Sequence, residues 1–256
     1  MNNFFSVAGK IAVVTGGSSG IGAMIARGFV ENGVKTYITS RKLEQLEQTA
    51  AELSGLGECI AIQSDLSTMA GVDAFAEEML KREPKIDILI NNAGAAWGAP
   101  VEEFPESGWD KVMDLNVKSI FFLSQRLLPA LRSAGDANEP SRIVNIASVN
   151  GLTHPHMNNY SYSASKAAVI QLTRHMAADI RPTNVNINGI APGFFPSKMT
   201  KQLQGHEQEI ADSLPARKVG ELADVAGTAI YLCSRASNYV CGHTVVLDGG
   251  QVADAG

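Results

Sequence analysis

A tyrosine and a lysine four residues apart could form a proton-donating pair. The stretch YSYSASK, residues 160–166, contains Tyr160, Tyr162 and Lys166. Both side-chain types are weak acids whose pKa can be moved toward neutrality, so either can transfer protons in catalysis. On a helix, residues four apart share a face and residues two apart do not. The spacing therefore favours Tyr162 over Tyr160 as the partner of Lys166, although chance alone also produces such pairs.

A glycine-rich turn indicates a second chemistry, the binding of phosphate. The sequence TGGSSGIG, residues 15–22, follows an apolar run and opens a helical pattern. Free N–H groups and the dipole at a helix start attract anions, and glycines allow a pyrophosphate to approach closely. The spacing is G-x-x-x-G-x-G, not the commoner G-x-G-x-x-G, and an ordinary turn is the alternative. We predict cofactor contacts at Gly16, Ser18, Ser19, Gly20, Ile21 and Gly22.

The end of the second expected strand is basic where many dinucleotide sites are acidic. An acidic residue about 20 positions beyond the glycines would bind the ribose 2′-hydroxyl of NAD. Here the chain reads Ser40-Arg41-Lys42. A carboxylate repels a 2′-phosphate, whereas a guanidinium can hold it in a fork. The pattern predicts NADP(H) as cofactor, bound through Ser40 and Arg41, unless Arg41 is a solvated surface arginine.

Short apolar runs alternate with longer amphipathic stretches throughout the chain. Strands are expected at 10–15, 34–40, 58–65, 85–92, 141–148, 184–191 and 243–250. Helices are expected at 20–33, 43–53, 68–82, 108–133, 160–180 and 220–234. This alternation predicts an α/β fold, a doubly wound parallel sheet with helices on both faces.

No low-complexity linker divides the sequence, so residues 1–256 are expected to form a single domain. The cofactor half would span about 1–150 and the catalytic and substrate half about 141–256. A long semi-regular segment at about 194–217 is typical of a lid over an active site.

Composition excludes several classes of protein. The net charge of −5 gives no basic surface for nucleic acid. No apolar run approaches the roughly 18 residues of a membrane span. The start of the chain lacks a secretion signal, and three widely spaced cysteines suit a reducing compartment, so we expect a cytoplasmic protein. The histidines and cysteines show no metal-ligand spacing, so no metal site is expected.

Six motifs in order resemble the short-chain dehydrogenase/reductase family over about Lys10 to Gly250. They are TGGSSGIG (15–22), NNAG (91–94), LNV (115–117), IASVNG (146–151), YSASK (162–166) and APG (191–193). The resemblance implies a seven-stranded, mainly parallel Rossmann-type sheet, assembled as a homotetramer or homodimer. The segments at 97–100, 108–117 and 191–200 are most similar to bacterial 3-oxoacyl reductases.

The resemblance also implies a catalytic tetrad of Asn116, Ser148, Tyr162 and Lys166. Tyr162 would protonate the alkoxide formed when a ketone is reduced, while the Lys166 ammonium lowers the tyrosine pKa and binds the nicotinamide ribose. Ser148 would hold the substrate carbonyl. The side chain or carbonyl of Asn116 would order a water that relays protons to Lys166. The alternative for Ser148 is an ordinary serine at a strand end.

Further cofactor contacts follow from the resemblance alone. Asp65, which could equally cap a helix, would contact adenine, and Pro192 with Gly193 would form the turn under the nicotinamide. Ser197 stands where the family usually has a threonine that holds the carboxamide. Ser19 stands where many NADP-using relatives carry arginine or lysine, which leaves Arg41 with less help. The remaining predicted contacts are Leu66, Asn92, Ala93 and Gly94, with Asn91 either at the ribose or bracing neighbouring strands.

The expected substrate surface is apolar and aromatic, which suits a fatty 3-oxoacyl chain or a hydrophobic ketone. The expected partner is thus a small-molecule carbonyl, either free or linked to a carrier protein or coenzyme A. Phe194 and Phe195 could instead pack the lid. The open functions are 3-oxoacyl reduction, turnover of another carbonyl or alcohol, and cofactor-dependent sensing without turnover. The candidate substrate residues are Trp97, Val149, His154, Met157, Phe194, Phe195 and Met199.

Overall fold

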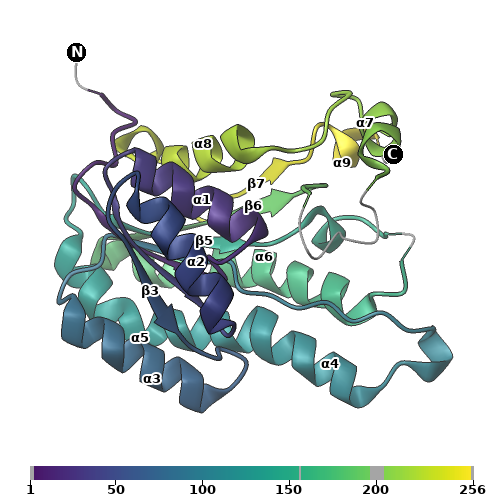
Figure 1. Ribbon diagram of the computed structural model, residues 1–256, viewed down its shortest axis with the longest axis horizontal. Coiled ribbons are helices and arrows are strands. Elements are labelled where there is room, and N and C mark those ends of the chain that lie inside the picture. Colours follow the sequence, from purple (N-terminus) through teal and green to yellow (C-terminus); the bar gives the residue numbers. More distant parts are fainter. Residues whose placement is uncertain (1–2, 156, 197–204, 255–256) are drawn as a thin grey trace.

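A computed structural model describes residues 3–155, 157–196 and 205–254. Within them, seven parallel strands form one sheet in the order β3-β2-β1-β4-β5-β6-β7 (Figure 1). The order reverses direction between β1 and β4, and ligands bind at such a point in open α/β sheets. The strands are β1 Ile11–Thr15, β2 Lys35–Ser40, β3 Cys59–Gln63, β4 Ile88–Asn91, β5 Ser141–Ile146, β6 Val185–Pro192 and β7 Thr244–Leu247.

Helices cover both faces of the sheet, as Figure 1 shows. On β1, Ala12 and Val14 pack with one layer of helices while Val13, between them, packs with the other. The first layer holds α1 Gly20–Glu31, α2 Leu43–Ser54 and α8 Leu222–Cys233. The second holds α3 Met69–Arg82, α5 Ser119–Ala134 and α6 Tyr160–Ile180. The alternating pattern of buried residues thus produces the doubly wound α/β fold that the sequence predicted.

Shorter helices stand at the rim of the sheet and in its connections. These are α4 Glu106–Met113, α7 Glu207–Ser213 and α9 Gln251–Asp254. Single 3₁₀ turns lie at Val101–Glu103, Val149–Gly151, Arg181–Thr183 and Arg235–Ser237.

One of the expected helices is interrupted in the structure. The helix expected at 108–133 is interrupted by a π-helical turn, Asp114–Lys118, between α4 and α5. The sheet is parallel throughout, which agrees with the seven-stranded, mainly parallel sheet that the resemblance implied. The single domain, its two halves and the lid remain predictions, and residues 197–204 of that lid lie outside the described chain.

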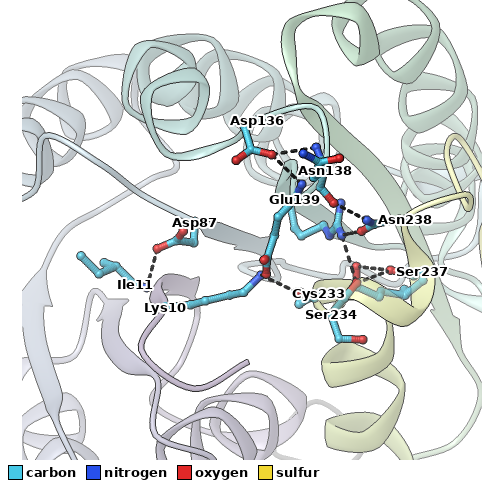
Figure 2. Close-up of polar contacts among 12 residues, drawn as sticks. Lys10, Ile11, Asp87, Asp136, Asn138, Glu139, Cys233, Ser234, Ser237 and Asn238 are labelled. Carbon is cyan, nitrogen blue, oxygen red and sulfur yellow. Dashed lines mark hydrogen bonds and ion pairs between the residues drawn. The ribbon is translucent and has the colours of Figure 1, made fainter. Parts of the chain in front are cut away.

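A polar network braces the sheet edge at which the strands begin (Figure 2). The Lys10 ammonium lies 2.8 Å from the Glu139 carboxylate and donates to the Cys233 carbonyl at the end of α8. The Arg142 guanidinium, only 1% exposed, donates to the Ser234 carbonyl at 3.0 Å. Two cations therefore satisfy carbonyls at the C-terminus of α8, where the helix dipole favours positive charge. The opposite edge, where the strands end, is left to present the candidate site.

Candidate active site

Threonine and asparagine side chains lock the ends of β1 and β4 together. The Thr15 hydroxyl oxygen accepts hydrogen bonds from the N–H groups of Asn92 and Ala93, both at 2.9 Å. The Asn92 side-chain amide donates in return to the carbonyls of Thr15 at 2.8 Å and Gly16 at 3.3 Å. The glycine-rich turn is therefore fixed in place by the loop after β4.

Gly22 allows α1 to approach this junction closely. A Cβ atom at Gly22 would lie 2.4 Å from the Asn92 side-chain nitrogen and 2.4 Å from the Gly16 carbonyl oxygen. Gly16 itself has a φ of +65°, a left-handed conformation that favours glycine. The cluster thus sets the position of the α1 N-terminus. Gly22 itself lies in the first turn of α1 and, unlike the other predicted residues of this motif, does not line the cleft.

A cleft of about 620 Å³ runs along this edge of the sheet. Following the strand order, its lining passes from the ends of β3 and β2, across the glycine turn, to the loop after β4 and the start of α6. The predicted cofactor residues that line it are Gly16, Ser18, Ser19, Gly20, Ile21, Ser40, Arg41, Asp65, Leu66, Asn92, Ala93, Gly94, Tyr162 and Lys166. Pro192 and Gly193 are not lining residues, and Ser197 lies outside the described chain.

Arg41 and Asp65 lie together at the β2 and β3 end of the cleft. The Arg41 Nε atom is 3.9 Å from a carboxylate oxygen of Asp65, and both side chains are about half-exposed. Burial opposes ionisation of Asp65, but hydrogen bonds from Ser67 and the charge of Arg41 outweigh it and lower the pKa of this carboxyl group. Lys42 lines the same part of the cleft. Two cations are therefore available there for a phosphate group.

The Asn116 side chain connects two segments of the site through hydrogen bonds. Its side chain, fully buried, accepts from the Ala95 N–H at 2.8 Å and donates to the Ala95 carbonyl at 3.0 Å and the Ser165 hydroxyl at 2.9 Å. It thereby joins the loop after β4 to α6. Asn116 lies in the π-helical turn Asp114–Lys118, a feature frequently found at functional sites. Its side chain is thus held by protein groups, and the predicted contact with a water stays a prediction.

Lys166 is held beside Tyr162 on the inner face of α6. Its Nζ atom donates to the Ile146 carbonyl at the end of β5 at 2.7 Å and lies 5.5 Å from the centre of the Tyr162 ring. Burial of the ammonium lowers the pKa of Lys166 to about 8. Burial likewise raises the pKa of Tyr162, and a side-chain hydrogen bond with Ser148 lowers it only in part.

The expected lowering of the tyrosine pKa by Lys166 is therefore wrong for the chain alone. Desolvation of the Tyr162 hydroxyl outweighs its hydrogen bond with Ser148, so the pKa of Tyr162 is raised and the side chain stays protonated at neutral pH in this state. A protonated tyrosine is the form that can donate a proton.

Tyr160 lies elsewhere, as the helical spacing predicted. It is 42% exposed, its ring packs edge-on to Phe104 at 5.9 Å, and its hydroxyl reaches the Asn158 side chain at 3.4 Å. Tyr162 lines the cleft and Tyr160 does not.

The predicted substrate residues do not gather in the cleft. Phe195 is 3% exposed, and its ring covers Gly220 so closely that a Cβ there would lie 2.4 Å from it. Phe195 is therefore part of the buried core. The alternative that Phe194 and Phe195 pack the lid stays a prediction. Trp97 is half-buried against Gly108, with the Lys111 ammonium 5.1 Å from its ring.

The other candidates divide by exposure. Val149 is buried, Phe194 is half-buried, His154 and Met157 are exposed, and Met199 lies outside the described chain.

Sequence reasoning missed several residues of the cleft. Lys42 stands next to Arg41 in a basic pair, which was a usable signal. Gln45 follows on the first turn of α2, and no sequence pattern indicates that its side chain reaches the cleft. The lining residues that were not predicted are Thr39, Lys42, Gln45, Ser64 and Leu115.

Comparison with known proteins identifies the family. The sequence profile described as short chain dehydrogenase matches residues 10–208. The chain belongs to the short-chain dehydrogenase family. The motifs had indicated this membership, and the parallel seven-stranded sheet agrees with it. The protein is therefore an enzyme of the oxidoreductase class.

Individual relatives match nearly the whole of this short-chain dehydrogenase. It is 44% identical over 253 residues to the rhamnolipids biosynthesis 3-oxoacyl-[acyl-carrier-protein] reductase of Pseudomonas aeruginosa, covering 98% of this chain and 99% of the relative. It is 37% identical to the 2-dehydro-3-deoxy-D-gluconate 5-dehydrogenase of Escherichia coli, covering 97% and 98%. The Pseudomonas aeruginosa RhlG/NADP active-site complex superposes with a TM-score of 0.94 at 43% identity, covering 98% of this chain and all of that one.

The described residues contain neither a membrane-spanning helix nor a cluster of metal-ligating side chains. None of their helices is long and apolar enough to span a bilayer. They also contain no group of three or more His, Cys, Asp or Glu side chains that could hold a metal ion.

Proposed function

We propose that this enzyme uses NADPH to reduce a carbonyl to a secondary alcohol, and that its substrate is a 3-oxoacyl thioester linked to a carrier protein or coenzyme A. The reaction type rests on the position of Tyr162 and Lys166 in the wall of a glycine-turn cleft. The substrate class is supported by 44% identity to a 3-oxoacyl-[acyl-carrier-protein] reductase.

The residues of the cleft fit NADP(H). Arg41 and Lys42 offer two cations for the 2′-phosphate. Gly20 and Ile21 begin α1, whose free N–H groups suit the pyrophosphate. An ammonium has three donors, of which the Ile146 carbonyl takes one, so Lys166 can also bind ribose hydroxyls. When bound, the reduced nicotinamide supplies the hydride. The similar RhlG structure is a complex with NADP.

Residues of the chain donate the proton and bind the substrate carbonyl. The Tyr162 hydroxyl, kept protonated by burial, donates its proton to the carbonyl oxygen as negative charge develops there. Ser148, hydrogen-bonded with Tyr162, is placed to bind the same oxygen. The Lys166 ammonium stabilises the tyrosinate that remains. Asn116 holds Ala95 and Ser165, and thereby positions the elements around this pair.

Arg41→Ala should weaken NADPH binding about tenfold to a hundredfold and leave NADH binding nearly unchanged. A charge-assisted bond to the 2′-phosphate contributes roughly 1.5–3 kcal/mol. Ser40→Asp should weaken NADPH binding further, because it adds repulsion of the phosphate and an acceptor for the NAD ribose. Both effects should shrink at high salt, since the Arg41 side chain is 55% exposed. Titration of both cofactors against the wild type and the two variants measures the six affinities.

Arg27→Ala is the matched control, because this exposed arginine of α1 pairs with Glu31. It should leave both cofactor affinities unchanged. Equal affinity of the wild type for NADH and NADPH, or equal weakening of both by Arg41→Ala, would contradict the proposed cofactor.

The substrate class is tested by NADPH oxidation with acetoacetyl thioesters, longer 3-oxoacyl thioesters and simple ketones. We expect the highest kcat/KM with a 3-oxoacyl thioester. A second candidate, oxidation of a hydroxyl on a sugar acid, is favoured by the 37% identity to a gluconate-type dehydrogenase. Turnover of 2-dehydro-3-deoxy-D-gluconate with NADP⁺, and none of the thioesters, would replace the first proposal with the second. The homotetramer or homodimer and the cytoplasmic location also remain predictions.

A further inference from the structure

The glycine turn is held by α2 through the carbonyl of Ser18. The Gln45 side-chain amide donates to this carbonyl at 2.8 Å. The Thr49 hydroxyl lies 3.1 Å from the same oxygen and 2.9 Å from the Gln45 backbone carbonyl, so the two acceptors share its one proton. Gln45 and Thr49 are four residues apart on α2 and therefore share one face. A third bond, from the Gly17 N–H to the Thr39 carbonyl at 3.2 Å, ties the turn to the end of β2. The turn is thus joined to the segment that contains Arg41.

This attachment fixes the direction of the next backbone donor. The Ser18–Ser19 peptide is trans, and in a trans peptide the C=O and N–H groups point in opposite directions. With the Ser18 carbonyl directed at α2, the Ser19 N–H is directed away from α2. In the described chain this N–H has no hydrogen-bond partner. Ser18, Ser19, Arg41 and Gln45 all line the cleft.

We propose that Gln45 and Thr49 are positioning residues for the 2′-phosphate of the cofactor. By holding the Ser18 carbonyl, they present the Ser19 N–H to the phosphate beside Arg41. The backbone donor takes the place of a basic side chain, which position 19 lacks. This inference rests on the NADP(H) dependence proposed above and concerns only the adenosine end of the cleft.

The geometry favours this over a purely structural role for the two side chains. Gln48, on the same helix, donates a hydrogen bond to Glu52 at 3.0 Å on the exposed side, which is typical of polar residues on a helix surface. Gln45 and Thr49 instead converge on one carbonyl of the turn, which is 31 residues before Thr49 in the chain. Backbone N–H groups around a turn are a recurrent means of binding phosphate.

The test uses two fragments that differ by the phosphate in question, 2′,5′-ADP and 5′-AMP. Their affinities are measured by calorimetry for the wild type and for the double variant Gln45→Met/Thr49→Val, which keeps side-chain size and removes both donors. The double variant should bind 2′,5′-ADP about tenfold more weakly, the usual scale for a lost bond to a charged group. Binding of 5′-AMP should change less than about twofold, because the remaining contacts are kept.

Matched variants separate positioning from stability. Gln48→Met removes a similar amide from the same helix and should keep the affinity ratio of the two fragments. Thr49→Ser retains the hydroxyl and should also keep it. Thermal unfolding identifies any variant that is not folded, and the single variant Gln45→Met then replaces the double one. A purely structural role would lower the unfolding temperature and leave the ratio unchanged.

The outcomes distinguish this inference from the proposed function. A wild type that binds both fragments equally would refute the NADP preference and the inference with it. A wild type that prefers 2′,5′-ADP, with a double variant that keeps this preference, would refute the inference alone. If the double variant bound both fragments more weakly by the same factor, Gln45 and Thr49 would only maintain the shape of the turn. That result would also overturn the inference.

Discussion

Replacing Tyr162 with phenylalanine should lower turnover at least about 100-fold, the usual scale for the loss of a general acid. The substitution removes the hydroxyl that hydrogen-bonds with Ser148 and keeps the ring beside Lys166. NADPH affinity should change little, because the ring still lines the cleft. The rate of NADPH oxidation at saturating substrate and the Kd of NADPH measure the two effects separately.

Tyr160→Phe is the matched control for this experiment. Tyr160 begins the same helix, but among the residues that the structure describes its hydroxyl hydrogen-bonds only with the Asn158 side chain, at 3.4 Å. Most of the turnover should therefore remain in this variant. Equal losses in the two variants, or a larger loss at Tyr160, would show that the catalytic tyrosine has been assigned to the wrong position.

The edge of the sheet that holds the site was predictable from the sequence. Glycine and asparagine motifs follow β1 and β4, and Ser148 closely follows β5. Because the carboxyl ends of parallel strands meet at one edge, motifs far apart in the chain had to converge there. The spacing of four residues in turn placed Tyr162 and Lys166 on one helix face. These inferences depend only on local periodicity and on the parallel connection of the strands.

The sequence did not show which of two neighbouring residues in the motif NNAG faces the cofactor cleft. The sequence left open whether Asn91 contacts the cofactor or braces the strands. In the structure Asn91 is 2% exposed and donates to the Ser124 hydroxyl and the Asn145 side chain. Asn92, the next residue, faces the cleft instead. Which of the two turns inward depends on where β4 ends, and strand ends are the least predictable part of an element.

The burial and contacts of side chains that depend on residues far away in the chain could not be predicted from the sequence either. Phe195 is buried because Gly220, in a later segment, leaves space for its ring. Gln45 reaches the Ser18 carbonyl because α2 packs against α1 and β2, and this packing brings α2 next to the glycine turn. The direction of the Tyr162 pKa shift depends on the balance between burial and the hydrogen bond with Ser148, and that balance can be judged only in the packed structure.

Replacing Lys166 with methionine should lower turnover about 100-fold or more, the scale for a lost group that stabilises developing charge. The ammonium lies 5.5 Å from the centre of the Tyr162 ring, where negative charge develops as the proton leaves. Burial lowers the Lys166 pKa to about 8, so the side chain is an ammonium below that pH and a neutral amine above it. Carbonyl reduction by the wild type should therefore fall as pH rises through about 8.

Three variants test whether Lys166 causes this dependence on pH. Lys166→Met should be slow at every pH and lack the fall near pH 8, because no group at that position titrates there. Lys166→Arg keeps its charge at all accessible pH values, so whatever activity it retains should also lack the fall. Lys118→Met changes an exposed lysine that pairs with Asp114, and it should keep the wild-type profile. Tyr162 cannot account for the fall, because burial raises its pKa above the ordinary tyrosine value and Lys166 loses its proton first. A wild-type rate that stays constant through this range, or a fall that persists in Lys166→Met, would contradict the assigned role of the ammonium.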